Sequence, residues 1–217
     1  MSGIVVSFEG IDASGKTTQI GRLETWLRKH GFDVLVRREP GGTELGEKIR
    51  EILLDPRWRV MHPRTEFLLY SASRAQLVEE DLFPFLQREN AIALLDRFYD
   101  SSTAYQGAGR GLDIKEVEHV NRFATAELRP HLTFFFDLPL EEARRRKGLQ
   151  SREADRLEAS DDAFYERVRQ GYLTLCAEEP DRMVRLDATL TVDAIAERIF
   201  EEVKKLLNNQ GLDWRAD

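Results

Sequence analysis

A short apolar run, IVVSFE at residues 4–9, leads directly into GIDASGKTT at residues 10–18, and a helical pattern follows. The second stretch fits G-x-x-x-x-G-K-[ST], in which glycines let backbone amides curl around phosphate oxygens. The spacing predicts that Lys16 reaches the β- and γ-phosphates of a nucleotide and that Thr17 ligates Mg²⁺. A plain glycine-rich turn is the alternative, and the flanking strand and helix argue against it. The predicted nucleotide-binding residues are Gly10, Ile11, Asp12, Ala13, Ser14, Gly15, Lys16, Thr17 and Thr18.

Short runs that are apolar through their centres alternate with helical patterns along the chain. Such continuous runs are typical of strands buried on both faces of a parallel sheet. Three of the runs end in aspartate, which would place carboxylates at the carboxyl edge, where open α/β sheets bind ligands. We therefore predict an α/β fold with a mostly parallel sheet, in one domain over residues 1–217. The predicted strands are 3–9, 33–38, 91–96, 132–137 and 183–187.

Helix boundaries are marked by capping residues. Gly31 follows a helical pattern that starts after the glycine-rich loop, and it is predicted to end that helix. Asp113, Ser160 and Thr191 each precede apolar residues at helical spacing, so each is predicted to cap a helix. The last segment, residues 208–217, has no periodicity and is predicted to be loose.

Composition narrows the class of protein. Charged residues make up 33% of the 217 residues and the net charge is −7, which argues against nonspecific nucleic-acid binding. No apolar run approaches the roughly 20 residues that a membrane span requires. The single cysteine, Cys176, excludes an internal disulfide and fits a reducing compartment. Because the first residues also lack a basic segment, we predict a cytoplasmic protein.

A phosphate-binding loop alone leaves several functions open, among them motors, switches and kinases. A GTPase switch would require D-x-x-G after a strand and N-K-x-D for guanine, and neither occurs outside the DASG of the loop itself. A motor or partition ATPase is not excluded by that absence. The remaining polar segments of the chain have to distinguish between these functions.

Three segments are unusually polar: 37–50, 66–76 and 94–111. The first could be an ordinary loop between a strand and a helix. In the second, Tyr70 and Arg74 share a helix face and could sandwich and hydrogen-bond a base, or could form a surface stacking pair. In the third, Asp96 ends a strand and resembles a Walker-B acid near Mg²⁺, with Arg97 after it. A capping aspartate with a partner arginine is the alternative there.

Residues 144–158, RRRKGLQSREADRLE, form a fourth charged segment. A charge run of this kind is usually a solvated helix face. In a phosphate-transfer enzyme it could instead belong to a lid, here at about residues 142–158, that brings an arginine over the γ-phosphate.

Together these motifs resemble the thymidylate kinases in their bacterial form, over about residues 3–207. The most specific match is LLDRFYDSSTAYQ at 94–106; FEG before the loop, REPGGT and DRLE add to it. The resemblance implies a P-loop NTPase fold with a five-stranded parallel sheet, flanking helices and a small helical lid. It also implies Mg²⁺-dependent transfer of the ATP γ-phosphate to dTMP, giving dTDP, by a homodimer.

By the same resemblance, Asp12 approaches the 3′-hydroxyl of dTMP, while Arg97 grips the acceptor phosphate with help from Arg50. The base end would consist of a ring that stacks on thymine, an arginine that reads a thymine carbonyl, a ring that excludes a ribose 2′-hydroxyl, and two nearby polar residues. In the same order, these residues are Tyr70, Arg74 and Tyr105, and the two nearby polar residues are Ser102 and Gln106. The implied catalytic residues are Lys16, Arg97, Arg152 and Asp12, and the implied metal ligands are Thr17 and Asp96.

Two features depart from the family pattern. Tyr70 stands where the family usually has phenylalanine, so its hydroxyl needs a partner. The phosphate loop lacks the arginine that some members carry there, so a lid arginine is expected to act instead. We assign this role to Arg152, with Arg156 as the next candidate, and place Arg144 or Arg145 nearer the adenine.

Two other functions stay open at this point. Another deoxynucleotide or deoxynucleoside kinase would share the loop, the Asp-Arg pair and the lid, and a nucleoside kinase would need Glu9 or Asp12 as a base. A protein of a different class could hydrolyse ATP for binding or regulation without any acceptor, but it would leave the polar 94–111 segment unexplained.

Overall fold

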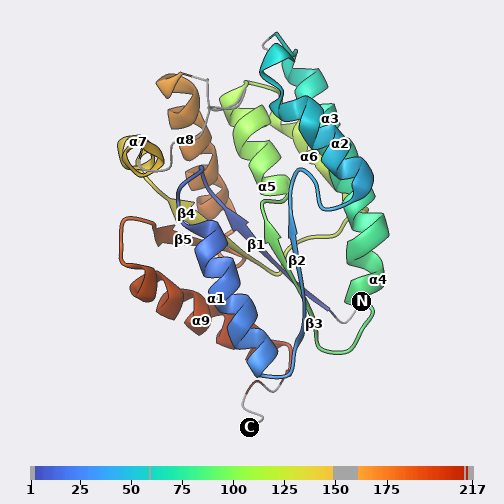
Figure 1. Cartoon of the computed structure of the whole chain (residues 1–217), viewed down its shortest axis with the longest axis vertical. Coiled ribbons are helices and arrows are strands. Elements are labelled where there is room, and N and C mark those ends of the chain that lie inside the picture. Colours follow the sequence, from blue (N-terminus) through green and yellow to red (C-terminus); the bar gives the residue numbers. More distant parts are fainter. Residues whose placement is uncertain (1–2, 59, 149–160, 213, 215–217) are drawn as a thin grey trace.

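The computed structural model describes residues 3–58, 60–148, 161–212 and 214. Its centre is a parallel sheet of five strands in the order β2-β3-β1-β4-β5 (Figure 1). This confirms the predicted fold class, and all five predicted strands are present with boundaries within one residue. The strands are β1 (Ile4–Glu9), β2 (Asp33–Arg38), β3 (Ala91–Asp96), β4 (Leu132–Asp137) and β5 (Met183–Asp187).

The three central strands are largely apolar because both faces of the sheet are covered. In β1, Val6 and Phe8 pack into one buried cluster, whereas Val5 between them packs into the cluster on the opposite face. In β4, Phe134 and Phe135 likewise enter different clusters. Alternate side chains point to opposite faces of a strand, so a strand with two covered faces is apolar at adjacent as well as alternate positions.

One face of the sheet is covered by two long helices, α1 (Lys16–Lys29) and α9 (Val192–Asn209), which pack against each other. Figure 1 shows both in front of the strands. The opposite face is covered by a longer series of helical segments. They are α3 (Pro63–Leu77), the π-helical turn η2 (Val78–Leu82), α4 (Phe83–Leu86), α5 (Tyr99–Ser102), the π-helical turn η3 (Thr103–Gly109) and α8 (Asp162–Glu178).

The remaining helices lie outside these two layers. Helix α2 (Glu44–Leu54) packs on α3, and α6 (Ile114–Ala124) packs on α3 and η3. Helix α7 (Leu140–Gly148) holds the start of the predicted lid, while 149–160 lies outside the described residues. A short 3₁₀ turn, η1 (Pro56–Trp58), follows α2.

Two of the three predicted caps are confirmed. Asp113 accepts a hydrogen bond from the Lys115 amide at 2.9 Å, and Thr191 accepts one from the Ala194 amide at 3.3 Å. The third prediction, Ser160, lies outside the described residues. Asp161 caps α8 instead, by accepting a bond from the Phe164 amide at 2.7 Å. Two adjacent residues of good capping type explain this shift of one position.

Part of the C-terminal segment packs against the rest of the protein, and residues 213 and 215–217 lie outside the described residues. Helix α9 includes Asn208, and beyond it Leu212 and Trp214 pack against the core cluster of α1 and α9. The Trp214 ring lies 5.9 Å from that of Trp26 on α1, and its indole nitrogen donates to Asn208 at 3.0 Å. Aromatic contacts thus hold the described part of 208–217 that follows the helix.

The topology concentrates functional groups at one edge of the sheet. The chain leaves β1 toward β2 and β3 on one side, and toward β4 and β5 on the other, so a switch point lies at the carboxyl end of β1. Open α/β sheets bind ligands in the crevice at such a point. Among the described residues, no helix is both long enough and apolar enough to cross a membrane.

Candidate active site

The loop after β1 lines a cleft, to which residues 12–18 all contribute. Gly10 has a φ of 136°, and a Cβ there would lie 2.7 Å from the Phe136 carbonyl oxygen, so only glycine fits. Lys16 is buried, and its ammonium donates to the carbonyls of Gly10 and Ile11, each at 3.1 Å. Burial, and then the neighbouring Arg97 charge, lower the Lys16 pKa to about 8. An anion in the cleft would offset both effects.

Thr17 and Asp96 lie together at this cleft, as expected of a metal site. The Thr17 hydroxyl donates to Asp96 Oδ2 at 3.2 Å. No group of three or more His, Cys, Asp or Glu side chains within the described ranges could form a protein cage for a metal. Mg²⁺ takes few protein oxygens and completes its shell with water and phosphate oxygens, so this pair fits Mg²⁺.

Arg97 lies between the phosphate loop and a second cleft. Its guanidinium pairs with Asp12 at 2.8 Å and lies 5.2 Å from the centre of the Tyr105 ring. Its backbone has a φ of 72°, a left-handed conformation that is uncommon outside glycine. Strain of this kind often accompanies a functional side chain held by its surroundings.

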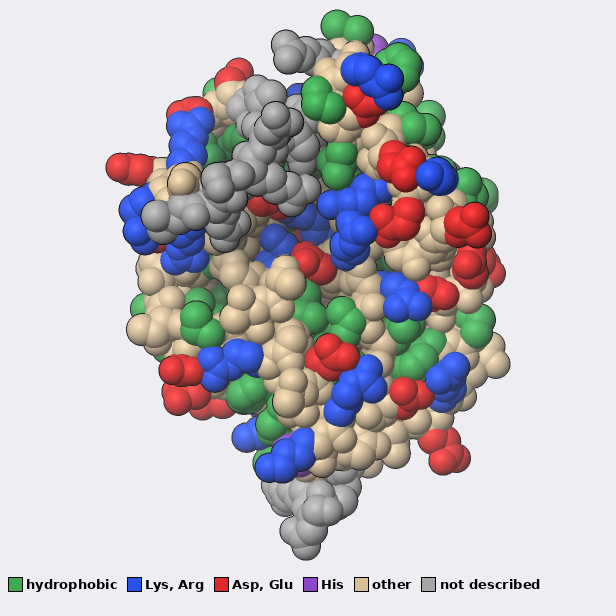
Figure 2. Space-filling view, viewed as in Figure 1, with side chains coloured by type: hydrophobic (Ala, Val, Ile, Leu, Met, Phe, Trp, Pro, Cys, Tyr) green, Lys and Arg blue, Asp and Glu red, His purple; other side chains and the backbone are tan. Residues whose placement is uncertain are grey.

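The second cleft is the candidate acceptor site, and it shares a wall with the phosphate cleft. Both clefts are lined by Asp12, Glu39, Arg50 and Arg97. Figure 2 shows Lys and Arg side chains gathered in the upper centre of that view, above the carboxyl edge of the sheet. The residues that line only the acceptor cleft are Pro40, Leu54, Tyr70, Ser101, Ser102, Tyr105, Gln106 and Tyr165.

Arg74 is not among the residues that line this cleft, and its contact with a base stays a prediction. Its side chain is 1% exposed, which excludes an exposed stacking pair. It donates to Glu39 at 2.8 Å, to Asn121 at 3.0 Å and to Ser102 at 3.1 Å, and also to the Phe98 carbonyl. Arg74 therefore supports the wall formed by Glu39 and Ser102.

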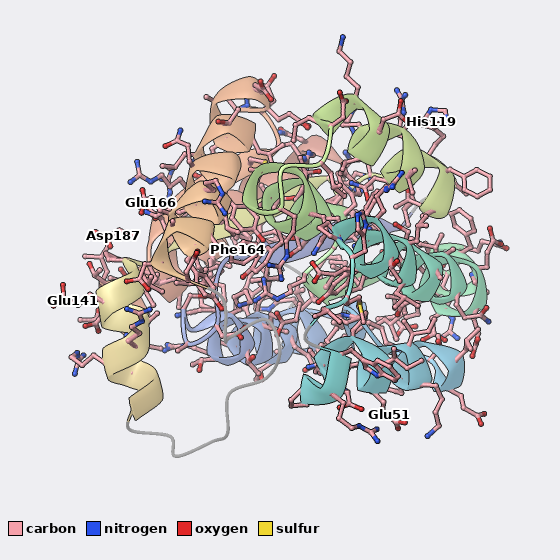
Figure 3. All side chains as sticks on the ribbon, turned by 90° about the horizontal axis from the view of Figure 1, so that it is seen from above. Glu51, His119, Glu141, Phe164, Glu166 and Asp187 are labelled. Atoms are coloured by element: carbon pink, nitrogen blue, oxygen red, sulfur yellow. The ribbon has the colours of Figure 1, made fainter. Side chains whose placement is uncertain are left out.

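The other residues predicted at the base end do line the cleft. Gln106 is fixed by donating its amide to the buried Glu66 at 3.0 Å. Burial raises the pKa of Tyr105 to about 12, so its phenol is neutral at physiological pH. Tyr105 is backed by Phe164 of α8, with ring centroids 6.0 Å apart. Viewed from above, Phe164 points inward between α8 and η3, whereas the other labelled side chains lie around the rim (Figure 3).

Comparison with known proteins agrees with this geometry. The family model described as thymidylate kinase matches residues 8–199. The chain belongs to the thymidylate kinase family. It is 50% identical over 207 residues to the thymidylate kinase of Thermoanaerobacter sp. (strain X514), covering 95% of this chain and 100% of that one. It is 48% identical to that of Caldanaerobacter subterraneus subsp. tengcongensis, covering 95% and 98%.

A solved structure gives the same result for the fold. The crystal structure of thymidylate kinase from Ehrlichia chaffeensis superposes with a TM-score of 0.76 at 28% sequence identity. The match covers 93% of this chain and 98% of the other. The parallel sheet flanked by helices is therefore the P-loop fold of a thymidylate kinase, as the sequence predicts.

The arginines of the charged segment after β4 differ from one another in their contacts. Arg144 pairs with Asp162 on α8 and not with the phosphate loop. Arg146 reaches the loop instead, donating to the Ala13 carbonyl at 3.4 Å and to the Ala188 carbonyl at 2.9 Å. Arg146 follows the buried Ala143 by three positions, so the two share a helix face, but the burial of Ala143 is known only from the structure. Arg152 and Arg156 lie outside the described residues.

The sequence also missed residues that complete the acceptor side of this kinase. Tyr165 enters the cleft from the first turn of α8, and Pro40 enters it after a cis Glu39–Pro40 peptide bond. Glu9, considered above as a base, is fully buried and lines neither cleft. Glu9 and Pro40 belong to the FEG and EPGG segments of the sequence, but nothing local indicated the direction of their side chains.

Proposed function

We infer that the protein transfers the γ-phosphate of ATP to dTMP, giving dTDP and ADP. The observation that carries this conclusion is the shared wall of the two clefts, in which Asp12 and Arg97 are paired at 2.8 Å. A donor phosphate on the loop and an acceptor phosphate beside Arg97 would be neighbours. Phosphoryl transfer between neighbouring phosphates depends on positioning and positive charge more than on covalent chemistry by protein side chains.

The reaction needs no general base in this proposal. The acceptor is a phosphate oxygen, and its second pKa of about 6 leaves it ionised at neutral pH. The difficulty is the repulsion between two anions, and Lys16 and Arg97 would offset it from opposite sides. Thr17 and Asp96 would hold Mg²⁺, which supplies further positive charge at the β- and γ-phosphates.

The acceptor nucleotide would lie along the second cleft, with its phosphate at Arg97 and Arg50. We propose that Asp12 takes the 3′-hydroxyl and that Tyr70 stacks on thymine. Ser102 and Gln106 would hydrogen-bond the base edge, which is supported by their rigid partners. Tyr105 would crowd out a ribose 2′-hydroxyl.

On the donor side, we propose that Arg146 borders the bound ATP in place of Arg144, since its contacts join the phosphate loop to the loop after β5. The assignment of Arg152 as the lid arginine stays a prediction. A cytoplasmic location also stays a prediction, which cell fractionation with an antibody to the protein would test.

We further propose a homodimer formed through α2, α3 and α6. These helices lie side by side in Figure 1, and α3 contacts both of the others. Large apolar side chains on them are exposed: Leu45 and Ile52 on α2, Leu68 on α3 and Phe123 on α6, the last at 85%. Apolar side chains grouped on neighbouring helices are typical of a protein interface.

Light scattering after size exclusion would test the dimer. Phe123→Glu is expected to shift the mass from twice the chain mass toward the chain mass, because it places a charge in the interface. Leu190→Glu is the matched control, since Leu190 is 54% exposed but precedes α9. A wild-type protein that elutes as a monomer at micromolar concentration would contradict the proposal.

The proposed activity is tested by release of ADP from ATP and Mg²⁺ with single acceptors: dTMP, dUMP, dCMP, dAMP, dGMP and thymidine. We expect strong release with dTMP and weaker release with dUMP, because one methyl group gives only ~10–200-fold discrimination. Release with thymidine but not dTMP would indicate a nucleoside kinase, in which Asp12 rather than the sealed Glu9 would be the base. Release without any acceptor would indicate an ATP-hydrolysing binding protein.

A further inference from the structure

Glu9 is a buried carboxylate that the proposed reaction does not use. It is the last residue of β1, directly before the phosphate loop, and it is 0% exposed. Its Oε1 accepts the Phe98 amide hydrogen at 2.7 Å. Its Oε2 accepts from the Ser101 hydroxyl at 2.5 Å and from the Tyr172 hydroxyl at 2.9 Å. One carboxylate therefore joins β1, the turn after β3 and helix α8.

The burial of Glu9 differs from that of another sealed carboxylate nearby. Asp100 is also 0% exposed, but Arg182 pairs with both of its oxygens, at 2.7 and 2.9 Å. No Lys or Arg pairs with Glu9 within the part of the chain that the structure describes; its three contacts are neutral donors. Desolvation, and then the Asp100 charge, accordingly raise its pKa to about 7. Such a site is unfavourable for a carboxylate, so stability alone does not account for it.

The turn that Glu9 holds is the one that carries Arg97. Phe98, whose amide Glu9 accepts, directly follows Arg97, and Ser101 bonds both Glu9 and the Arg97 guanidinium, the latter at 3.4 Å. Arg97 has its left-handed φ of 72° between two anchored amides, its own on the Phe8 carbonyl at 3.0 Å and that of Phe98 on Glu9. A strained backbone persists only where its surroundings fix it.

We propose that Glu9 is a positioning residue for the acceptor phosphate: its two oxygens fix the turn after β3 and thereby the direction of Arg97. It does not touch substrate, because it lines neither cleft. The same carboxylate ties this turn to Tyr172, so α8, which brings Tyr165 to the acceptor cleft, is held in register with Arg97. The inference rests on the proposed function, which the turnover of dTMP by the unmodified protein tests separately.

Geometry and charge can be separated at this position. Glu9→Gln keeps the shape: its oxygen can accept from Phe98, and its amide can donate to the hydroxyls of Ser101 and Tyr172, which also accept. Glu9→Asp keeps the charge but is one methylene too short to span the same partners. If reach matters, glutamine is the mild substitution and aspartate the severe one.

The experiment measures kcat and KM separately for dTMP and for ATP. We expect Glu9→Asp to lower kcat/KM for dTMP at least about tenfold with the KM for ATP within about twofold, and Glu9→Gln to stay within about threefold of wild type, as a positional loss predicts. Ser7→Ala is the matched control, since Ser7 is a buried polar residue of the same strand that bonds Thr133 and not the turn. Ser7→Ala is expected to leave kcat/KM for dTMP and kcat/KM for ATP unchanged.

A double-mutant cycle with Arg97→Ala asks whether Glu9 acts through Arg97. If it does, adding Glu9→Asp to Arg97→Ala changes kcat/KM for dTMP by less than about twofold, because coupled residues are not additive. A full tenfold further loss in that background would overturn the proposal. So would a Glu9→Gln protein as impaired as Glu9→Asp, or equal rises in the KM for ATP and for dTMP. If Glu9→Asp does not fold, the kinetics and the thermal melting of Glu9→Gln, each compared with wild type, still test the proposal.

Discussion

The two clefts of this thymidylate kinase are made in different ways. The phosphate cleft is lined mainly by one continuous stretch, residues 12–18, and its lysine is held by carbonyls of the same loop. The acceptor cleft is formed by side chains from α2, α3, the β3–α5 turn, η3 and α8. The first site is encoded locally, whereas the second depends on contacts between segments far apart in the chain.

Support is distributed accordingly. Behind the acceptor cleft, Arg74 joins Glu39 and Asn121, which are 35 and 47 residues away from it in the sequence. The phosphate loop, in contrast, directly joins β1 to α1, which are adjacent in the sequence. A substitution of Lys16, which lines only the phosphate cleft, should therefore act on ATP chemistry, while one behind the acceptor cleft should change stability and substrate binding together.

The largest effect is expected from Lys16→Met. Loss of the charge at the transferred phosphate should lower kcat by at least about 10³-fold, because electrostatic stabilisation dominates phosphoryl transfer. Binding of dTMP, measured by calorimetry, should stay within about twofold if the two clefts are independent. Lys29→Met, at the exposed end of the same helix, is the control. Loss of dTMP binding in Lys16→Met would show that the two clefts are not independent.

Arg97→Ala should come next, and it should fall on the acceptor side. Removal of a charged group at the reacting phosphate should lower kcat/KM for dTMP by about 10²-fold or more. The KM for ATP should change by less than about threefold, since the Lys16 cleft remains. Steady-state kinetics with each substrate varied in turn measures this, with the exposed Arg198→Ala as control. Near-normal kinetics with dTMP would remove Arg97 from the acceptor site.

Arg74→Met should show that the acceptor wall is also structural. The change leaves Glu39 buried without its cation, and breaking a buried ion pair typically costs about 3–5 kcal/mol. Urea denaturation should report a loss of that size, and the KM for dTMP should rise in parallel. Arg88→Met is the control, because its pair with Asp33 is exposed and should contribute less than about 1 kcal/mol. Equal stability of the two variants would mean that Arg74 is not the support inferred here.

Tyr70→Phe should have the smallest effect. The ring is retained, so stacking on the base should persist, and kcat/KM for dTMP should stay within about twofold of wild type. Tyr70→Ala is the contrast, since loss of a stacked ring typically costs about 1–3 kcal/mol, or roughly 5- to 150-fold. Equal activity of the alanine and phenylalanine variants would show that the ring does not stack on the acceptor.

The sequence predicted most of the fold because the decisive signals are local. A strand with two covered faces is apolar through its centre, and all five predicted runs are strands. The cap of α8 was misplaced by one residue because Ser160 and Asp161 are both capping residues, and local chemistry does not choose between them.

The acceptor side could be predicted only as a set of residues, with help from the family resemblance. Helical spacing put Tyr70 and Arg74 on one face, but burial of Arg74 is decided by Glu39 and Asn121, which spacing cannot see. Three consecutive arginines gave no sign that Arg146, and not Arg144, contacts the phosphate loop. Direction of a side chain is a tertiary property, so these details required the structure.

The aromatic contacts at the far end of α1 also make the protein its own optical probe. Trp26 and Trp214 lie 5.9 Å apart, and Lys204 lies 4.8 Å from the Trp214 ring, so their fluorescence should follow melting of the α1–α9 layer. Trp58 is 50% exposed and comes shortly after Leu54, which lines the acceptor cleft. In a Trp58→Phe protein, the fluorescence of Trp26 and Trp214 would report unfolding. The signal that this variant loses relative to wild type would report filling of the acceptor cleft.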